Sequence, residues 1–473
     1  MRKCPVFSQC GGCDYCSVPY TEQLLCKEEK VKKLLKDICV TESIIGCDNP
    51  FNYRNKVHAA FSSSRRTGVK CGRYQAGTHK IVENFDCLIE DSVAQKIIKD
   101  VKEIAVKFKV PIYDEDRREG NLRKVLVRVA VKKQEYMLVL VVAKSEFPGK
   151  KNFLKEIRKI HPEITTIILN VNSRTDSMIL GDKSFVEYGS GYITDELLNL
   201  KFRISDKSFY QINQAQTEKL YSKAIEFADI HENDRVLDAY CGIGTIGMTV
   251  AKSQPHARVT GVELNRSAVN DAIKNKKLNS LSNIDFICAD ATEYMMNSEA
   301  HSAKFDVVIL DPPRAGTTPE FIRACKAVSP KRIVYVSCNP VTLANDLKLF
   351  IKAGYKPERA VPVDMFPLTE HVETVCLLSQ LSEAPKMEMR VKLTEFDLTE
   401  AEAKATYSDI KEYVKEHTGL KVSSLYIAQV KQKYGIIERD CYNLPKSDDS
   451  RQPKCPEHKE KAIVEALKHF KMI

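Results

Sequence analysis

The chain has 473 residues, 43% hydrophobic and 29% charged, a composition that predicts a globular protein of several domains. No apolar run reaches the roughly 18 residues of a membrane span, and the opening residues have no signal-peptide pattern, so we expect a cytoplasmic protein with no membrane part. The net charge of +10 is uneven, because residues 1–205 carry 36 Lys and Arg against 26 Asp and Glu, whereas residues 206–473 carry 37 of each. A basic N-terminal part beside a neutral remainder predicts contact with a polyanion, although a solvated basic surface is the simpler alternative.

Cysteines crowd the first residues of the chain. In Cys4-Pro-x4-Cys10-Gly-Gly-Cys13, two glycines allow the backbone to fold tightly around a bound centre. Thiols this dense in a reducing compartment indicate zinc or an iron–sulfur cluster rather than disulfides. Three close cysteines need a fourth, and local geometry favours Cys16, while Cys87 lies too far along the chain for geometry to select it.

Residues 45–205 have mostly the pattern of strands, with alternation in Lys124–Val131 and a β-rich run in Tyr136–Ala143. Two basic clusters lie in this region, near Tyr53, Phe61 and Tyr74: Arg65, Arg66, Lys70 and Arg73, and then Arg117, Arg118, Arg123, Lys124 and Arg128. Positive charge interleaved with rings suits the phosphates and unstacked bases of RNA. The alternative is that the rings belong to the core of a sheet.

From about Ser205 the chain alternates between strands and helices, which predicts an α/β domain. The expected strands are Arg235–Ala239, Val259–Glu263, Ile284–Cys288, Asp306–Leu310, Arg332–Val336 and Val372–Leu378. Gly242-x-Gly244-x-x-Gly247 follows the first of them and Glu263 ends the second, as in a nucleotide-binding βαβ unit. This pattern alone would also suit a dinucleotide-dependent dehydrogenase, but nothing downstream indicates a hydride-transfer site.

Two further strand ends carry residues suited to chemistry. The strand Arg332–Val336 leads to Ser337-Cys338-Asn339-Pro340, and a helical pattern begins at Thr342, so Cys338 lies where a parallel sheet presents its reactive groups. A cysteine taken alone is more often a small buried hydrophobe. Asp311-Pro-Pro-Arg314 holds a rigid carboxylate at another strand end, and Asp-Pro-Pro after a strand recurs among S-adenosylmethionine-dependent enzymes that methylate bases.

Together with His371-Val-Glu373-Thr, these motifs resemble those of the RNA uracil-C5 (5-methyluridine) methyltransferase family. The resemblance covers about residues 1–380 and extends to the cysteines, which are typical of the iron–sulfur members that act on 23S ribosomal RNA. It implies a Rossmann-like methyltransferase domain, a β-rich RNA-binding domain and an N-terminal iron–sulfur segment.

The resemblance also implies the roles of individual residues. Cys338 is expected to be the nucleophile and Glu373 the general base. The expected S-adenosylmethionine contacts are Gln211 at the methionine part, Tyr240, Thr245, Glu263, Asp290 at the adenine, and Asp311 near both cofactor and uracil. The expected ligands of a [4Fe–4S] cluster are Cys4, Cys10, Cys13 and Cys87, so the resemblance, and not geometry, selects Cys87 over Cys16. Zinc is the alternative occupant.

The chemistry of uracil explains why these residue types are needed. C5 of uracil is a poor nucleophile toward a methyl sulfonium, and a thiolate that adds to C6 gives C5 the carbanion character that it lacks. The C5 proton must then be removed by a base before the thiolate can leave. The target base must also leave its stack to be reached.

The sequence divides into four segments, the last of which is a helical unit at the end of the chain. We expect an iron–sulfur segment at 1–44, an RNA-binding domain at 45–205, a methyltransferase domain at 206–382 and a helical extension at 383–473. In the extension, Tyr407–His417 and Ser423–Tyr434 have the shape of a helix-turn-helix, with Lys421, Lys431 and Lys433 where nucleic-acid contacts would lie. A helical unit that packs on the enzyme or meets a protein partner is the alternative.

Several rival functions remain on the sequence alone. The same reaction on the T-loop uridine of transfer RNA is the first. A DNA cytosine-C5 methyltransferase is the second, although its nucleophile typically follows proline, and here serine precedes Cys338. A non-catalytic iron–sulfur RNA-binding protein is the third. We expect a monomer with RNA as its partner.

Overall fold

In the computed structural model the chain divides into two compact units, Met1–Ala384 and Pro385–Ile473. The structure describes residues 4–64, 66, 68–75, 78–176, 178–300, 304–381, 407–434 and 455–470. Arg65 and the predicted boundary between residues 382 and 383 lie outside these described residues. Within the described ranges, no helix combines the length and the apolar character that crossing a membrane requires.

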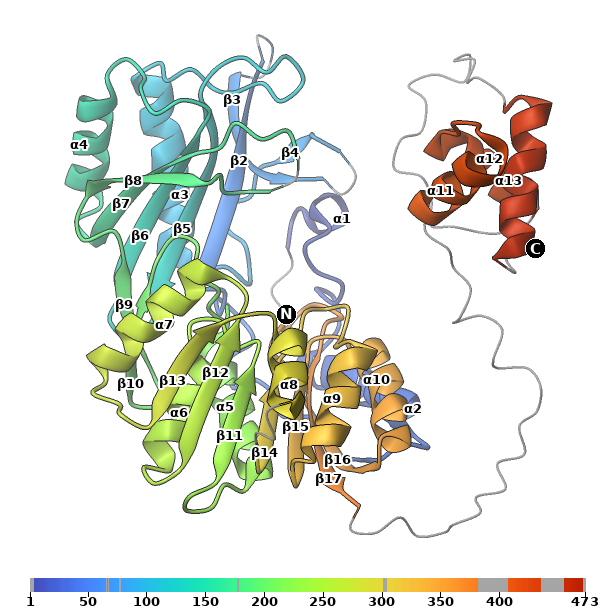
Figure 1. The fold of residues 1–473 in the computed structure, drawn as a ribbon. Coiled ribbons are helices and arrows are strands. Elements are labelled where there is room, and N and C mark those ends of the chain that lie inside the picture. The colour runs from blue at the N-terminus through green and yellow to red at the C-terminus, as the bar shows by residue number, and fades with distance from the viewer. Residues whose placement is uncertain are drawn as a thin grey trace. The chain divides into compact units, whose positions relative to one another are not determined.

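A large mixed sheet in the first unit carries the predicted strand ends (Figure 1). Its described strands are β1 (Val40–Thr41), β11 (Arg235–Ala239), β12 (Arg258–Glu263), β13 (Ile284–Cys288), β14 (Val307–Leu310), β15 (Arg332–Ser337), β16 (Tyr355–Val363) and β17 (Glu373–Gln380). They lie in the order β1-β16-β17-β15-β14-β11-β12-β13, and β17 runs antiparallel to both of its neighbours. All six predicted strands are present, each with its ends within two residues of the prediction. Strand β16 was not predicted, because Pro357 and Pro362 interrupt its pattern.

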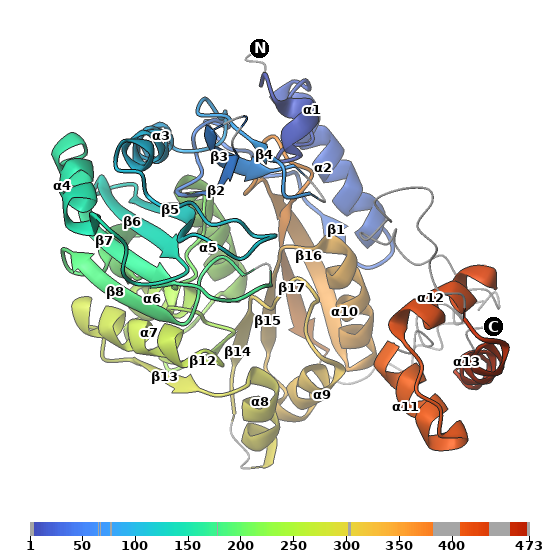
Figure 2. The same ribbon diagram turned by 90° about the horizontal axis from the view of Figure 1, so that it is seen from above.

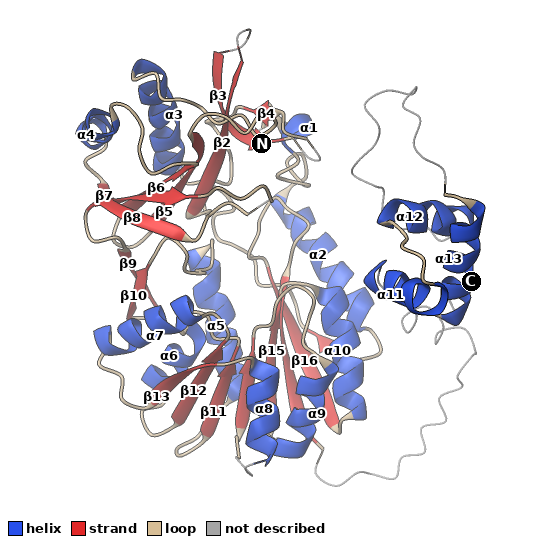
Figure 3. Cartoon of the chain, turned by 45° about the horizontal axis from the view of Figure 1, so that its top comes forward, coloured by secondary structure: helices blue, strands red, loops and turns tan. Residues whose placement is uncertain are grey.

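Helices cover both faces of this sheet, as the blue helices on either side of the red strands in Figure 3 show. They are α2 (Tyr20–Leu35), α5 (Gln214–Ala228), α6 (Thr245–Ser253), α7 (Arg266–Leu278), α8 (Ala291–Ala300), α9 (Pro319–Val328) and α10 (Pro340–Lys352). Helices α5 and α6 contribute to one apolar core, and α2, α8, α9 and α10 to the other. Strand β14 divides its side chains between the two cores, with Val307 and Ile309 in the first and Val308 and Leu310 in the second. The α/β arrangement expected after about Ser205 is therefore present, and β1 and α2 from the N-terminal segment are added to it.

A second sheet belongs to the central part of the chain. Its described strands are β2 (Lys56–Ser64), β3 (Gly68–Tyr74), β4 (Ile81–Val82), β5 (Leu122–Ala130), β6 (Glu135–Val142), β7 (Ile164–Val171) and β8 (Lys183–Tyr188), in the order β4-β3-β2-β5-β6-β7-β8. Two helices, α3 (Ser92–Lys107) and α4 (Lys150–Ile160), pack their apolar faces on this sheet (Figure 2). The region predicted as mostly strand is therefore a mixed α/β layer. A hairpin of β9 (Ile193–Leu197) and β10 (Leu200–Ile204) follows it.

Two arginines predicted to contact RNA are instead buried in this central part. The Arg123 side chain is 2% exposed and forms an ion pair with Glu115, and its Nη1 donates to the carbonyl oxygens of Asn172 and Arg174. Arg128 is also buried, and its Nη2 donates to the carbonyl oxygen of Asp206 (3.0 Å). The prediction of surface RNA contacts is wrong for both, because these guanidinium groups bind the sheet to neighbouring loops.

The described part of the second unit is a small helical core. Helices α11 (Tyr407–Thr418), α12 (Ser424–Lys433) and α13 (Glu457–His469) bury Ile410, Val414, Ile427, Val430, Ile463 and Leu467 among themselves. The predicted pair of helices is present, but Lys431 is 2% exposed and Lys433 forms an ion pair with Glu460 of α13. The predicted nucleic-acid contact is therefore wrong for Lys431, and Lys433 has a protein partner.

Candidate active site

Cys338 lies directly after strand β15, in the turn that leads into α10. Asn339 is the N-cap of that helix, since its side-chain oxygen accepts a hydrogen bond from the backbone N–H of Val341 (3.1 Å). Pro340 follows at the first helical position, where no backbone donor is needed. The half-buried Cys338 thiol is thus presented at the carboxyl end of a parallel strand.

The turn that contains Asp311 is tied to the turn that contains Cys338. The carbonyl oxygen of Arg314 accepts hydrogen bonds from Asn339 Nδ2 (3.2 Å) and from the Thr342 hydroxyl (3.3 Å). Asp311 itself directly follows β14, the parallel neighbour of β15. Two motifs that are separate in the sequence therefore form one continuous edge of the site.

Glu373 reaches this edge from the opposite direction. It is the first residue of β17, and Thr374 pairs with Ser337 across the antiparallel β15–β17 ladder. An antiparallel strand begins where its neighbour ends. The residues next to that pair, Glu373 and Cys338, therefore lie together at the edge of the sheet.

Burial controls the electrostatics of these groups. It raises the pKa of Asp311 to about 7 and the pKa of Glu373 well above its usual value, with the Asp311 charge adding to the effect on Glu373. Burial also raises the pKa of the Cys338 thiol to about 11. The negative charges of Glu373 and Asp311 raise this pKa further, while the positive charge of Arg314 lowers it. A carboxyl group with a raised pKa is suited to accept a proton near neutral pH.

The glycine-rich turn lies between β11 and α6. Gly242 has φ 56° and Gly244 has φ 82°, a backbone region that favours glycine. A Cβ atom added at Gly244 would also lie 2.4 Å from the ring of Phe286. The carboxylate of Glu263, at the end of β12, accepts a hydrogen bond from the Gly242 N–H (3.1 Å), so the turn and the acidic strand end form one unit, as predicted.

One pocket of about 660 Å³ collects most of the predicted site residues. It is lined by Gln211, Tyr240, Glu263, Asp290, Asp311, Cys338 and Glu373, among others. The volume of this pocket and its mixed polar and apolar lining suit a ligand of nucleoside size. Thr245 lies instead in a smaller adjoining cavity with Gln211, Tyr240 and Asp311, where its hydroxyl is 3.0 Å from the Tyr221 hydroxyl.

Some lining residues were not found from the sequence, among them Leu264 and Phe366. Leu264 is 68% exposed at the end of β12, and Phe366 comes from the loop before β17. Leu264 could have been found by its place directly after Glu263, but no local signal marks Phe366. Asp290 has a structural role as well, because its Oδ1 accepts the backbone N–H groups of Thr292 and Glu293 at the start of α8.

The N-terminal cysteines lie together near α1 (Phe7–Cys10). Cys4, Cys10, Cys13, Cys16 and Cys87 line one small cavity, and all of them are free thiols. Within the described residues, no three His, Cys, Asp or Glu side chains have the arrangement of a metal site. The donor set nevertheless fits a thiolate-bound centre, since five soft ligands share one cavity. It does not separate Cys16 from Cys87.

Known proteins similar to this chain identify its family. Residues 151–381 match the family model described as tRNA (Uracil-5-)-methyltransferase. An RNA methyltransferase of Bacillus cereus is 40% identical over 80% of this chain and 83% of its own length, and one of Halalkalibacterium halodurans is 39% identical over 79% and 82%. Both are named as uncharacterized.

A solved structure provides a further match. The tRNA (uracil-54, C5)-methyltransferase of Pyrococcus abyssi, in complex with S-adenosyl-L-homocysteine, superposes with a TM-score of 0.64 and 29% identity, over 76% of this chain and 83% of that one. Residues 151–381 contain every strand of the large sheet except β1, and all of the residues named above as lining the pocket. The chain therefore belongs to the tRNA (uracil-5-)-methyltransferase family and is an S-adenosylmethionine-dependent RNA (uracil-5) methyltransferase.

Proposed function

We propose that the protein methylates C5 of a uridine in 23S ribosomal RNA, with Cys338 as the nucleophile and Glu373 as the general base. The observation that carries the mechanism is the shared edge of β15 and β17, where a thiol and a buried carboxyl group line one pocket. A flipped uracil in that pocket would have its C6 near one group and its C5 proton near the other.

The proposed reaction has two stages. The Cys338 thiolate adds to C6, the C5=C6 electrons move to C5, and C5 takes the methyl group that S-adenosylmethionine supplies. Glu373 then accepts the C5 proton, the C5=C6 double bond re-forms and the thiolate leaves. The raised pKa values of Glu373 and Cys338 mean that both groups must be ionised in the complex with RNA before they act. Once ionised, Glu373 is a stronger base than an ordinary carboxylate.

The residues that would hold the cofactor are those around the glycine-rich turn. The carboxylate of Glu263 is suited to the ribose hydroxyl groups, because it stands at the end of β12 beside the turn. The remaining contacts that we propose are Gln211, Tyr240, Thr245, Asp290 and Asp311. These contacts are proposed because the five side chains line the pocket or its adjoining cavity.

We further propose that Cys4, Cys10, Cys13 and Cys87 bind a [4Fe–4S] cluster, with zinc as the alternative. The support is the shared cavity and the density of the thiols. Cys16 lines the same cavity, so the choice between it and Cys87 rests on the family resemblance.

Recognition of RNA by the central domain is supported by a second cavity of about 600 Å³ beside its sheet. Tyr74 and the exposed Arg118 line it, whereas Arg73, at the same cavity, is paired with Glu90, and Lys124 is buried. Such a surface can hold phosphates and stacked bases. We propose the four segments expected from the sequence, with boundaries near residues 44, 205 and 382, and a monomer that acts on RNA in the cytoplasm.

The rival substrate is the T-loop uridine of transfer RNA, since the Pyrococcus abyssi relative acts on tRNA uracil-54. The deciding experiment is to map 5-methyluridine in ribosomal and transfer RNA from a deletion strain that carries either the wild-type gene or Cys338→Ala. We expect one or more 23S positions to lose the methyl group in the deletion and to regain it only with the wild type. Loss confined to transfer RNA would overturn the ribosomal assignment.

A further inference from the structure

The loop of residues 364–372 joins β16 to β17 and ends at the proposed base. Val363 pairs with Glu373 across the two strands, so the loop closes a hairpin and is followed directly by the proposed base. Phe366 and His371 of this loop line the catalytic pocket together with Glu373. Any displacement of the loop would therefore move the Glu373 carboxyl group, which must reach C5.

Other parts of the chain satisfy the backbone of this loop. Carbonyl oxygens of surface loops usually accept hydrogen bonds from water, but five consecutive ones here have protein donors. Their donors are Gln216 Nε2 to Asp364 O (3.0 Å), Asn213 Nδ2 to Met365 O (3.1 Å), Lys27 Nζ to Phe366 O (3.0 Å), the Tyr53 hydroxyl to Pro367 O (3.0 Å), and the N–H groups of Asp14 and Tyr15 to Leu368 O (2.9 and 3.0 Å).

The strongest attachment comes from helix α2. Lys27 Nζ lies 2.6 Å from Asp364 Oδ1, and both side chains are fully buried. The other carboxylate oxygen of Asp364 accepts the Tyr20 hydroxyl (2.8 Å), so Asp364 is held at both oxygens. A buried ion pair of this kind is costly to break, because each charge alone would remain in a low-dielectric interior.

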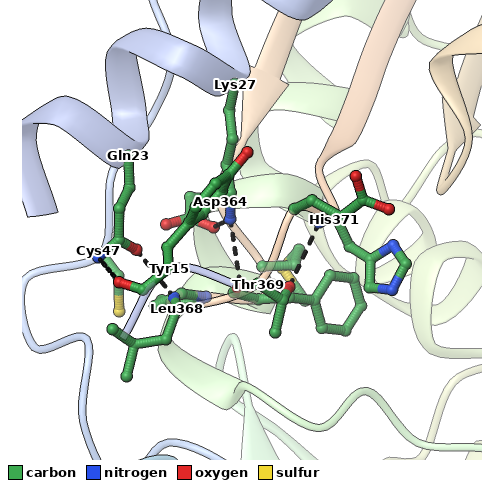
Figure 4. A network of polar contacts seen from close by, with 12 residues as sticks. Tyr15, Gln23, Lys27, Cys47, Asp364, Leu368, Thr369 and His371 are labelled. Atoms are coloured by element: carbon green, nitrogen blue, oxygen red, sulfur yellow. Dashed lines mark hydrogen bonds and ion pairs between the residues drawn. The ribbon is translucent and has the colours of Figure 1, made fainter. Parts of the chain in front are cut away.

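A second attachment from the same helix holds the strained part of the loop. Leu368 has φ 67°, an unfavourable region for a leucine. Its N–H donates to Gln23 Oε1 (3.0 Å), and its side chain packs on Leu88 and Ile89 beside three of the N-terminal cysteines. Figure 4 shows Gln23 and Lys27 extending from one helix toward the loop that contains Leu368 and His371. Helix α2 thus binds the loop at two points, through Lys27 at Asp364 and through Gln23 at Leu368.

We propose that helix α2, through Lys27 and Gln23, is a positioning element for Glu373: it fixes the 364–372 loop so that the carboxyl group reaches the C5 proton. This inference rests on the proposed function of Glu373. Catalytic groups must be held to within about 0.5 Å of their productive geometry, and a displacement of about 1 Å can cost about 100-fold in rate. Lys27 and Gln23 touch no reacting atom, so they act only through the loop.

The test separates proton removal from the earlier steps. With Lys27→Met and an unmodified 23S ribosomal RNA transcript, or a transfer RNA transcript if that is what the wild type methylates, we expect turnover to fall by about 10- to 100-fold. The covalent RNA–protein adduct should accumulate, because the thiolate cannot leave while C5 keeps its proton. Adduct formation with a 5-fluorouridine transcript, which needs no base, should stay within about twofold of the wild type, because it does not require Glu373 to reach a C5 proton.

The matched control is Lys32→Met on the same helix, where Lys32 is about half exposed and forms an ion pair with Glu28. It should change neither measurement. If Lys27→Met fails to fold, Tyr20→Phe, which removes a single hydroxyl from Asp364, must show the same accumulation of adduct to a smaller degree.

Two results would overturn the inference. The first is an equal loss in turnover and in 5-fluorouridine adduct formation, which indicates general damage rather than positioning. The second is unchanged adduct levels in a folded Lys27→Met or Tyr20→Phe variant when Glu373→Gln does accumulate adduct. If Glu373→Gln itself accumulates none, the proposed role of the base fails, and that outcome is distinct from a failure of positioning.

Discussion

Replacing Asp238 by asparagine tests the electrostatics beneath the glycine-rich turn. Asp238 lies on β11, is fully buried, and its Oδ2 accepts the Gly247 N–H (2.7 Å). Burial raises its pKa from 3.8 to about 7. Because the folded state binds this proton more tightly than the unfolded state, the associated stability is present below pH 4 and is lost as the pH rises through 7.

The magnitude follows from the two pKa values. Relative to a side chain that is always neutral, the ionisable Asp238 costs the folded state about 2 kcal/mol at pH 5 and about 4 kcal/mol at pH 8. The asparagine of the Asp238→Asn variant keeps an oxygen for the Gly247 N–H, but its amide donors can cost about 1–3 kcal/mol if they find no acceptor, equally at both pH values. The free energy of unfolding of the variant minus that of the wild type should therefore rise by about 2–3 kcal/mol when the pH is raised from 5 to 8.

The assay is urea unfolding of both proteins at pH 5 and pH 8. The chain has no tryptophan, so far-UV circular dichroism is the suitable signal. The difference between the two pH values isolates ionisation, because packing and hydrogen-bond costs cancel in it. A stability difference between variant and wild type that is the same at both pH values would refute the raised pKa of Asp238.

Three other predictions concern separate parts of the chain. Cys338→Ala should abolish methylation of RNA, because C5 then cannot attack the methyl donor, while calorimetry should show near-normal binding of S-adenosylmethionine; methylation at a comparable rate would contradict the covalent mechanism. Protein purified without oxygen should be brown with broad absorbance near about 400 nm, and Cys87→Ser should lose iron while Cys16→Ser keeps it; a colourless protein with stoichiometric zinc would exclude the cluster. Truncation after residue 382 should leave a folded enzyme with unchanged activity on an RNA hairpin. The affinity for large RNA should keep the same dependence on salt concentration, because Lys431 is buried and Lys433 is paired. A weaker dependence on salt would instead support a nucleic-acid role for the C-terminal unit.

Local patterns predicted the methyltransferase sheet well. The β-branched runs gave β11 and β13 their correct ends, and the Asn339-Pro340 pair marked the end of β15, because short buried strands and proline boundaries are local features. The proximity of Glu373 to Cys338 could not be derived in this way. It depends on β17 inserting antiparallel between β15 and β16, a register set by the whole sheet.

Burial of charged residues was the main source of error. Arg123 and Arg128 lie in a basic alternating strand, a pattern typical of a surface that binds RNA. Their guanidinium groups instead satisfy carbonyl oxygens of Asn172 and Asp206, acceptors 49 and 78 residues away. A local pattern contains no information on partners at that distance, so the long-range role of these side chains became apparent only from the fold.

The ion pair between Lys27 and Asp364 joins residues that are 337 positions apart. At a synthesis rate of about 5–20 residues per second, the 364–372 loop is made tens of seconds after helix α2, so the two can pack together only then. The packing around the N-terminal cysteines is completed equally late, since Leu368 forms part of the apolar cluster around Cys4, Cys13 and Cys87. The packing around these thiols and the pairing of β17 with β15 are therefore completed late, when almost all of the first unit has been made.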